Sequence, residues 1–274
     1  MAKQTGLVGF ITRPFRRGGP LVPVVRLHGV IAADNRSGRI NIQNVAPLLQ
    51  RAFEMPGKTV AIIVNSPGGS PVQSRLISKR IRDLAREHDK HVIVFVEDAA
   101  ASGGYFIATA GDEIIADPSS IVGSIGVIFA GFGFTGTMDK LGVERRVHTA
   151  GKNKSTLDPF LPEKPEDVER IKQMELDIHQ VFIDWVKARR GSKLKAPDDQ
   201  LFTGEFWSGV RGLDLGLVDA LGDLHETLHG RFGDDVRLKV IEARRGLFRL
   251  PSFGLAADLA AAVEDRAVWT RLGL

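Results

Sequence analysis

A serine set among small residues is the first feature of the chain that could do chemistry. Ser102 lies in the stretch AAASGG (99–104), which follows the apolar run 91–96. A serine at such a sharp turn is accessible, and the N–H of Gly103 could stabilise an oxyanion that develops beside it. The pattern is not GxSxG, because alanine stands two residues before the serine. The same residues are typical of a helix start with Ser102 as N-cap, so both interpretations stay open.

A second turn, rich in glycine, follows another apolar run. Residues 65–70 (NSPGGS) come directly after 59–64 (TVAIIV). Gly68 and Gly69 can adopt positive φ, which lets backbone N–H groups point at a ligand without interference from a Cβ atom. In open α/β sheets, ligands bind at the carboxyl ends of the strands. The turn is therefore a candidate binding element, and a purely structural turn is the alternative.

A serine nucleophile needs a general base, and the chain offers histidines and lysines. None of the seven histidines lies in a turn beside an acidic partner, and His179 is expected on the surface of a helix. A lysine is protonated at neutral pH unless burial in apolar surroundings favours its neutral form. Lys152 and Lys154 lie in AGKNKSTLDPF (150–160), which on its own is typical of a solvated loop. The residues alone do not identify the base.

Alternating strands and helices are expected to position these turns. Continuous apolar runs predict strands that are covered on both faces, and apolar residues at helical spacing predict amphipathic helices. Strands are expected at 21–31, 59–64, 91–96 and 113–116, and helices at 40–54, 71–88, 105–110, 165–190 and 255–269. One face of the 165–190 helix carries Ile171, Met174, Ile178, Val181, Phe182 and Trp185. The alternation indicates an α/β fold with parallel sheet layers flanked by helices.

The composition excludes several classes of function. The absence of cysteine rules out disulfides, thiolate metal sites and a cysteine nucleophile. The net charge is +4 over 274 residues, without a dense basic stripe, so no nucleic-acid partner is expected. No run of 18 apolar residues occurs, so we expect no transmembrane helix and a cytoplasmic protein. Phe10, Arg13 and their neighbours would allow peripheral contact with a membrane; a solvated terminus is the alternative.

Four segments form a set that is more specific than any one of them. They are VNSPGGS (64–70), EDAAASGGYFIATAGDEIIADPSSIVGSIGVIF (97–129), AGKNKSTLDPF (150–160) and GLDLGLVDALGDL (212–224). In order and spacing the set resembles peptidase family S49, the signal peptide peptidase A and SohB-like group. The resemblance implies a Clp protease/crotonase-like α/β fold, in which repeated β-β-α units form a spiral and parallel sheets are flanked by helices.

The resemblance also implies roles for individual residues. Ser102 would be the nucleophile of a serine endopeptidase. Lys154 would be its general base, because the Gly-x-x-Lys-Ser/Asp context of the family's lysine falls on residues 151–155. Ser124, in the GSIG stretch, matches the serine that hydrogen-bonds the lysine amine and helps to place it.

The family's oxyanion hole would use the N–H of Gly103 and one from Gly68 or Gly69. Such a Ser/Lys dyad needs no metal and no organic cofactor. The implied substrates are apolar peptides such as signal-peptide remnants or fragments of membrane proteins. The family also implies a homo-oligomer with active sites at subunit interfaces, because neighbouring subunits share the dyad. The usual N-terminal membrane anchor of the family is not expected here.

The simplest division of the chain has three parts. These are a flexible basic segment (1–20), a peptidase domain (21–230) and a strand–helix extension (231–274) that contacts its own domain or another subunit. Two other functions compete with the peptidase. An acyl-CoA enzyme of the crotonase type would have no need of Lys154, and an inactive homologue would act only as an oligomeric scaffold.

Overall fold

A central, mainly parallel sheet organises the chain. The computed structural model describes residues 19–34, 36, 38–242, 263 and 265–274. The strands are β1 (Leu21–His28), β2 (Thr59–Ser66), β3 (His91–Ala101), β4 (Glu113–Ala116), β5 (Ile121–Gly123), β6 (Phe206–Ser208), β7 (Ala220–Leu221) and β8 (Arg237–Val240). Their order is β6-β5-β3-β2-β1-β8, with β4 beside β3 and β7 beside β4. Every pair is parallel except β5 with β6, so the predicted α/β class is confirmed.

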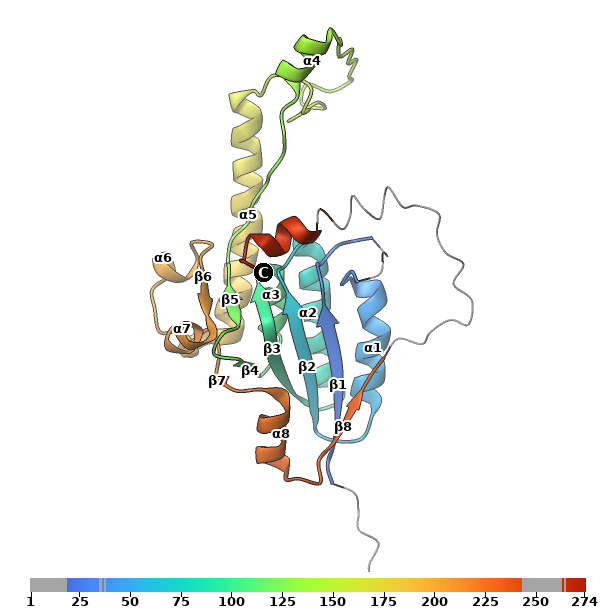
Figure 1. Ribbon diagram of the computed structural model, residues 1–274, viewed down its shortest axis with the longest axis vertical. Helices are drawn as coiled ribbons and strands as arrows, with labels where there is room; N and C mark the ends of the chain where they lie inside the picture. Colours follow the sequence, from blue (N-terminus) through green and yellow to red (C-terminus); the bar gives the residue numbers. More distant parts are fainter. Residues whose placement is uncertain (1–18, 35, 37, 243–262, 264) are drawn as a thin grey trace, which may run out of the picture.

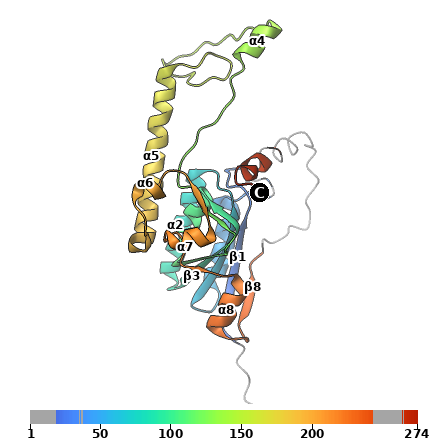
Figure 2. The same ribbon diagram turned by 60° about the vertical axis from the view of Figure 1, so that its left-hand side comes forward.

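Helices cover both faces of this sheet (Figures 1 and 2). On one face, α1 (Ile42–Glu54), α2 (Pro71–Glu87) and α3 (Gly103–Ala108) enclose the larger apolar core. On the other face, Leu228 of α8 (Leu224–Phe232) shares a smaller core with side chains of β2 and β3. The remaining helices are α4 (Thr135–Leu141), α5 (Pro165–Arg190), the 3-10 turn η1 (Gly191–Lys193), α6 (Asp198–Leu201) and α7 (Gly209–Asp214).

Local sequence explains why the two turns of interest lie at strand ends. All residues of β2 are buried, as expected for a strand covered on both faces. α2 then begins with Pro71, whose missing N–H has no intrahelical partner to lose, and the Ser70 hydroxyl accepts the N–H of Gln73. β3 is longer than predicted, because the alanines 99–101 pair with β5. This extension puts Ser102 at the carboxyl edge of the sheet.

One part of the chain leaves the body of the molecule (Figure 1). Residues 127–164, here called the arm, extend from the sheet, form α4 and return to the start of α5. α5 matches the predicted 165–190 helix, but its apolar face is buried only in the C-terminal half. Phe182 and Val186 are buried, whereas Met174 is 48% exposed, because the N-terminal half of the helix extends along the arm, away from the body of the molecule (Figure 1).

Some predictions fall outside the described residues. They include the flexible basic segment with its membrane contact and most of the predicted 255–269 helix, of which residues 263 and 265–269 are described and are helical. In the extension, β8 pairs with β1 at the edge of the main sheet. Among the described helices, none is both long enough and apolar enough to cross a bilayer.

Candidate active site

Ser102 stands where β3 ends and α3 begins, and its backbone is strained. Its φ of 51° and ψ of −120° are rarely adopted by residues other than glycine. Its N–H donates to the carbonyl of Gly123 at 2.8 Å, which fixes the turn. Ser102 occupies the N-cap position of α3, yet its side chain accepts no capping hydrogen bond. The helix-cap interpretation therefore explains why Ser102 lies at the start of α3, but it gives the Ser102 hydroxyl no role.

Strand register brings Ser124 beside Ser102. β3 and β5 pair in parallel with Ala101 opposite Gly123, so the residues that follow the two strands are neighbours. Ser124 has a similar backbone, with φ of 54°, and its N–H donates to the carbonyl of Glu205 at 2.6 Å. Both serines line one cavity of about 710 Å³. The structure thus brings together these two predicted site residues.

The glycine turn after β2 lies directly against Ser102. A Cβ atom on Gly68 would lie 2.8 Å from the Cβ of Ser102 and 2.9 Å from the nitrogen of Gly103, so only glycine fits. The N–H of Gly68 donates to the Ser66 hydroxyl at 3.2 Å. The N–H groups of Gly69 and Gly103, in contrast, have no acceptor in the described part of the chain. Two unpaired amides beside a serine are the arrangement that stabilises an oxyanion.

An apolar cavity of about 240 Å³ opens beside Ser102. Its wall includes Phe106 of α3, whose ring lies 5.0 Å from that of Phe182 and 5.4 Å from that of Trp185, both on α5. The indole N–H of Trp185 donates to the Thr109 hydroxyl at 2.9 Å, which holds α5 against α3. The lining is completed mainly by Val72, Arg75, Val127, Ile178 and Val181. The cavity can accept an apolar side chain of a bound peptide.

The C-terminal residues form part of the larger cavity, which the sequence did not indicate. Val268, Arg271 and Leu272 line this cavity together with Ser102. Figure 1 shows the C-terminal helical residues crossing near the carboxyl ends of the central strands. The ring of Trp269 stacks on that of His28, with centroids 6.2 Å apart.

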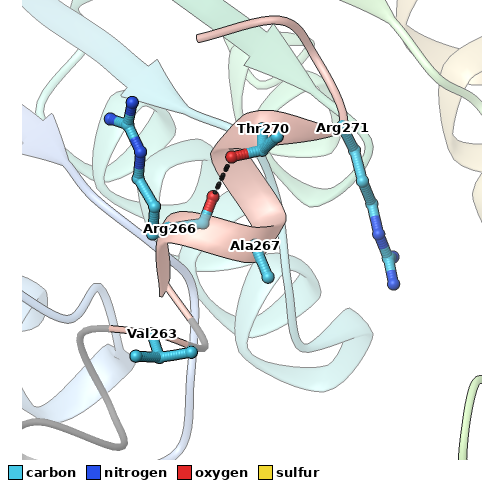
Figure 3. Close-up of a pocket in the computed structure, with 5 residues that line it drawn as sticks. All are labelled: Val263, Arg266, Ala267, Thr270 and Arg271. Carbon is cyan, nitrogen blue, oxygen red and sulfur yellow. Dashed lines mark hydrogen bonds between the residues drawn. The ribbon is translucent and has the colours of Figure 1, made fainter.

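A separate hollow lies on the C-terminal helical residues themselves (Figure 3). It is lined by Val263, Arg266, Ala267, Thr270 and Arg271. The Thr270 hydroxyl donates to the carbonyl of Arg266 at 2.7 Å. No residue of the Ser102 turn lines this hollow, so we do not assign it to the candidate active site.

Within a single chain the structure does not bring Lys154 to Ser102. Lys154 lies in the arm between α4 and α5, its side chain is exposed, and it lines neither cavity that contains Ser102. From Phe182 beside the apolar cavity back to Pro165 at the start of α5, the helix extends roughly 25 Å at 1.5 Å per residue. Lys152 is exposed in the same loop.

His179 is a residue of the site that sequence reasoning missed. It lies on α5 as predicted, but it lines the larger cavity together with Ser102 and Ser124. Its Nε2 is 3.0 Å from the carbonyl oxygen of Ile125, a contact across 54 positions that helical spacing cannot reveal. Among the described residues, no group of His, Asp and Glu side chains is arranged to hold a metal ion.

A buried ion pair fixes the end of α5 and explains one of the four segments that carry the family resemblance, 212–224. The Arg190 side chain is 2% exposed and donates to Asp219 at 2.7 Å and to the carbonyl of Gly216 at 3.1 and 2.7 Å. Asp219 also accepts the N–H of Ile114 and pairs with Lys193, each at 2.8 Å. Burial raises the pKa of Asp219, but hydrogen bonds from the two cations outweigh burial and lower that pKa. The segment therefore serves to position α5.

Known proteins resemble the chain in sequence. The model of peptidase family S49 matches residues 84–231, more than half of the chain. A Brucella abortus protein named Na(+)/H(+) antiporter NhaA is 53% identical over 283 aligned positions, which cover 96% of this chain and 38% of that protein. Protease 4 of Haemophilus influenzae is 35% identical over 219 positions, which cover 76% of this chain and 34% of that protein. The chain thus spans little more than a third of the length of either relative.

The fold also has a solved counterpart. A structure of the 1510-N membrane-bound stomatin-specific protease, a lysine-to-alanine mutant in complex with a substrate peptide, has a TM-score of 0.53 to this chain. The two are 17% identical, and the match covers 90% of this chain and 99% of that one. At this identity the likeness concerns the fold, and it confirms the predicted Clp protease/crotonase-like class.

Proposed function

The chain belongs to peptidase family S49, and we propose that it is a serine endopeptidase in which Ser102 is the nucleophile and Lys154 the general base. One observation carries the proposal. Ser102 is held on a strained turn beside the unpaired N–H groups of Gly69 and Gly103, at the edge of an apolar cavity. A helix start or a structural turn needs none of these three features.

The chemistry is acyl transfer in two steps. Neutral Lys154 takes the hydroxyl proton of Ser102 while the serine oxygen bonds to the peptide carbonyl carbon. The N–H groups of Gly69 and Gly103 stabilise the oxyanion; Gly68 is the less suitable donor because Ser66 already accepts its N–H. The lysine ammonium then gives its proton to the leaving amine, and the C–N bond breaks. Neutral lysine next removes a proton from water, which attacks the ester, and the proton returns to Ser102.

In the proposed arrangement, Lys154 reaches this position from a second copy of the chain. Its side chain is exposed at the far end of the arm, and a lysine acts as a base only where apolar surroundings favour its neutral form. The arm carries large apolar side chains that are exposed in the single chain and that a neighbouring subunit would cover. They include Ile128, Phe129, Phe132, Phe134, Leu141 and Val143. These exposures support a homo-oligomer in which neighbouring subunits share the dyad.

The proposed substrates are apolar peptides, such as remnants of signal peptides or fragments of membrane proteins. The support is the cavity beside Ser102, whose lining from Val72 through Phe106 to Phe182 is almost entirely apolar. A side chain that fills this cavity would leave water and place the following carbonyl at the serine.

The proposal is tested with two inactive variants and their mixture. Ser102→Ala and Lys154→Ala should each abolish cleavage of an internally quenched apolar peptide without changing the melting temperature, whereas Lys152→Ala should stay active. Mixing the two inactive proteins should restore about a quarter of wild-type activity if subunits exchange at random and each site takes one residue from each neighbour. Full activity of Lys154→Ala would refute the base assignment, and no recovery after confirmed exchange would refute the shared dyad.

The same variants separate the competing functions. Binding of an acyl-CoA that is unaffected by Lys154→Ala, without peptide cleavage, would favour the crotonase-like alternative. An oligomer that neither cleaves peptides nor reacts with serine reagents would favour the scaffold.

A further inference from the structure

Two side chains of α5 hold the segment that leads from Ser124 into the arm. The Nε2 of His179 lies 3.0 Å from the carbonyl oxygen of Ile125, and the N–H of Phe129 donates to Glu175 Oε1 at 2.6 Å. Residues 175 and 179 are four positions apart, so both side chains project from one face of the helix. They contact the segment at its two ends, four residues apart.

The direction of the contact with His179 fixes the proton on the imidazole. A carbonyl oxygen only accepts hydrogen bonds, so the Nε2 that faces Ile125 must carry a proton. This is true of the neutral Nε2–H tautomer and of the imidazolium alike. Because this nitrogen carries its proton in order to form the contact, it is not available as a base.

Between these two contacts lies a stretch of backbone that borders both cavities. Gly126 and Val127 line the apolar cavity, and together with Ile128 they line the larger cavity that contains Ser102. In the described part of the chain, the carbonyl of Gly126 and the backbone polar groups of Val127 and Ile128 have no hydrogen-bond partner.

The positions of these contacts along the chain indicate which backbone groups of residues 126–128 point away from α5. In an extended chain, the N–H and C=O of alternate residues point to opposite sides. The two groups bound by α5 belong to residues 125 and 129, which share one parity, so in an extended 126–129 stretch the carbonyl of Gly126 and both groups of Ile128 point away from α5. The N–H of Gly126 instead bonds the carbonyl of Ser124 at 3.0 Å. A peptide can pair with such an edge through its own backbone.

We propose that His179 and Glu175 are positioning residues that hold 126–128 as the edge along which the peptide substrate lies. This assignment rests on the proposed peptidase function and adds to it the device that aligns the substrate. Neither side chain takes part in bond making. Without them the edge would move with the arm, and a bound peptide would lose its alignment with Ser102.

The test compares peptide cleavage with labelling by a reagent too small to need the edge. His179→Ala and Glu175→Ala should each lower kcat/KM for an internally quenched apolar decapeptide by about three- to tenfold, as expected for the loss of one hydrogen bond, mainly through KM. Diisopropyl fluorophosphate should label Ser102 at a rate within about twofold of wild type in both variants, since one phosphoryl group makes no use of the edge. His179→Gln and Glu175→Gln, which keep a donor and an acceptor, should recover most of the loss.

A control variant and stability measurements separate a loss of substrate alignment from a general effect on the helix or the fold. Gln173→Ala lies on the same helix, and among the described residues its side chain bonds only Asp177, so this variant should behave as wild type; melting temperatures should be recorded for every variant. Unchanged kcat/KM in the double variant of His179→Ala and Glu175→Ala would overturn the assignment. So would an equal loss of peptide cleavage and of labelling, or failure of His179→Gln to recover activity, which would indicate a role in proton transfer. A wild-type protein that neither cleaves the peptide nor labels at Ser102 would overturn the proposed function itself.

Discussion

Replacing Gly68 by alanine tests whether the two turns must lie as close together as they do. Gly68 has φ of +105°, a conformation that costs an alanine about 1–2 kcal/mol. Its new Cβ would also lie 2.8 Å from the Ala101 carbonyl oxygen and the Ser102 Cβ, and 2.9 Å from the Gly103 nitrogen. These neighbours are backbone or Cβ atoms, so they can give way only if the whole turn moves.

Forcing such a contact into a closely packed region costs about 1–3 kcal/mol, so Gly68→Ala should lower the free energy of unfolding by about 2–5 kcal/mol in total. Gly233→Ala provides the matched control. Gly233 also has a positive φ, of +82°, but a Cβ there would meet nothing within 4 Å. Gly233→Ala should lose only the conformational contribution, about 1–3 kcal/mol for a residue with φ of 82° and ψ of 171°.

Urea unfolding followed by circular dichroism measures the two free energies. Peptide cleavage measures the effect of the substitution on catalysis, because moving Ser102 and Gly103 by about 1 Å should lower kcat roughly 100-fold. Gly233→Ala, far from the site, should keep wild-type kcat. If Gly68→Ala matched Gly233→Ala in both stability and kcat, the close approach of the turns would have no role in placing the nucleophile.

Three further changes have clear expected outcomes. Arg190→Met should lower the free energy of unfolding by about 3–5 kcal/mol in urea titrations, because Asp219 would lose its buried partner; a loss below about 1 kcal/mol would contradict this. Hydrogen bonds led by that from Arg231 lower the pKa of Glu113 to about 2, so this pair stabilises the fold above the unfolded pKa near 4.5 and loses its effect as the pH falls toward 2. Arg231→Ala should therefore cost roughly 1 kcal/mol at pH 6, a value reduced by solvent screening, and less at pH 3; equal losses at both pH values would refute the linkage. Phe106→Ala should raise KM for apolar peptides more than for polar ones, and equal effects would argue against the cavity as the binding pocket.

The sheet and its helices could be predicted because their signals are local. The apolar run of β2 and the spacing of apolar residues in α2 depend only on which faces are covered. The C-terminal end of β3 was harder to predict, because the alanines before Ser102 have little strand propensity of their own. They pair as a strand since β5 lies alongside them. Register, which no local pattern encodes, then brings Ser124 next to Ser102.

The parts that could not be predicted depend on contacts between distant residues. His179 is one of several polar side chains on α5, and only its contact with Ile125 distinguishes it. The wall that Leu272 contributes to the larger cavity arises because the end of the chain returns to the carboxyl edge of the sheet. The exposure of Met174 follows from the length of the arm, which helical periodicity does not report. Lys154 stays a prediction from family resemblance, because its environment in an oligomer depends on atoms outside a single chain.

Mapping a covalent adduct tests the central claim most directly. The wild-type protein is treated with a fluorophosphonate, digested, and sequenced by tandem mass spectrometry, and loss of peptide cleavage is followed in parallel. We predict one adduct, on Ser102, formed in step with the loss of activity and absent from Ser102→Ala. An adduct on another serine such as Ser124, or complete inactivation without modification of Ser102, would contradict the account.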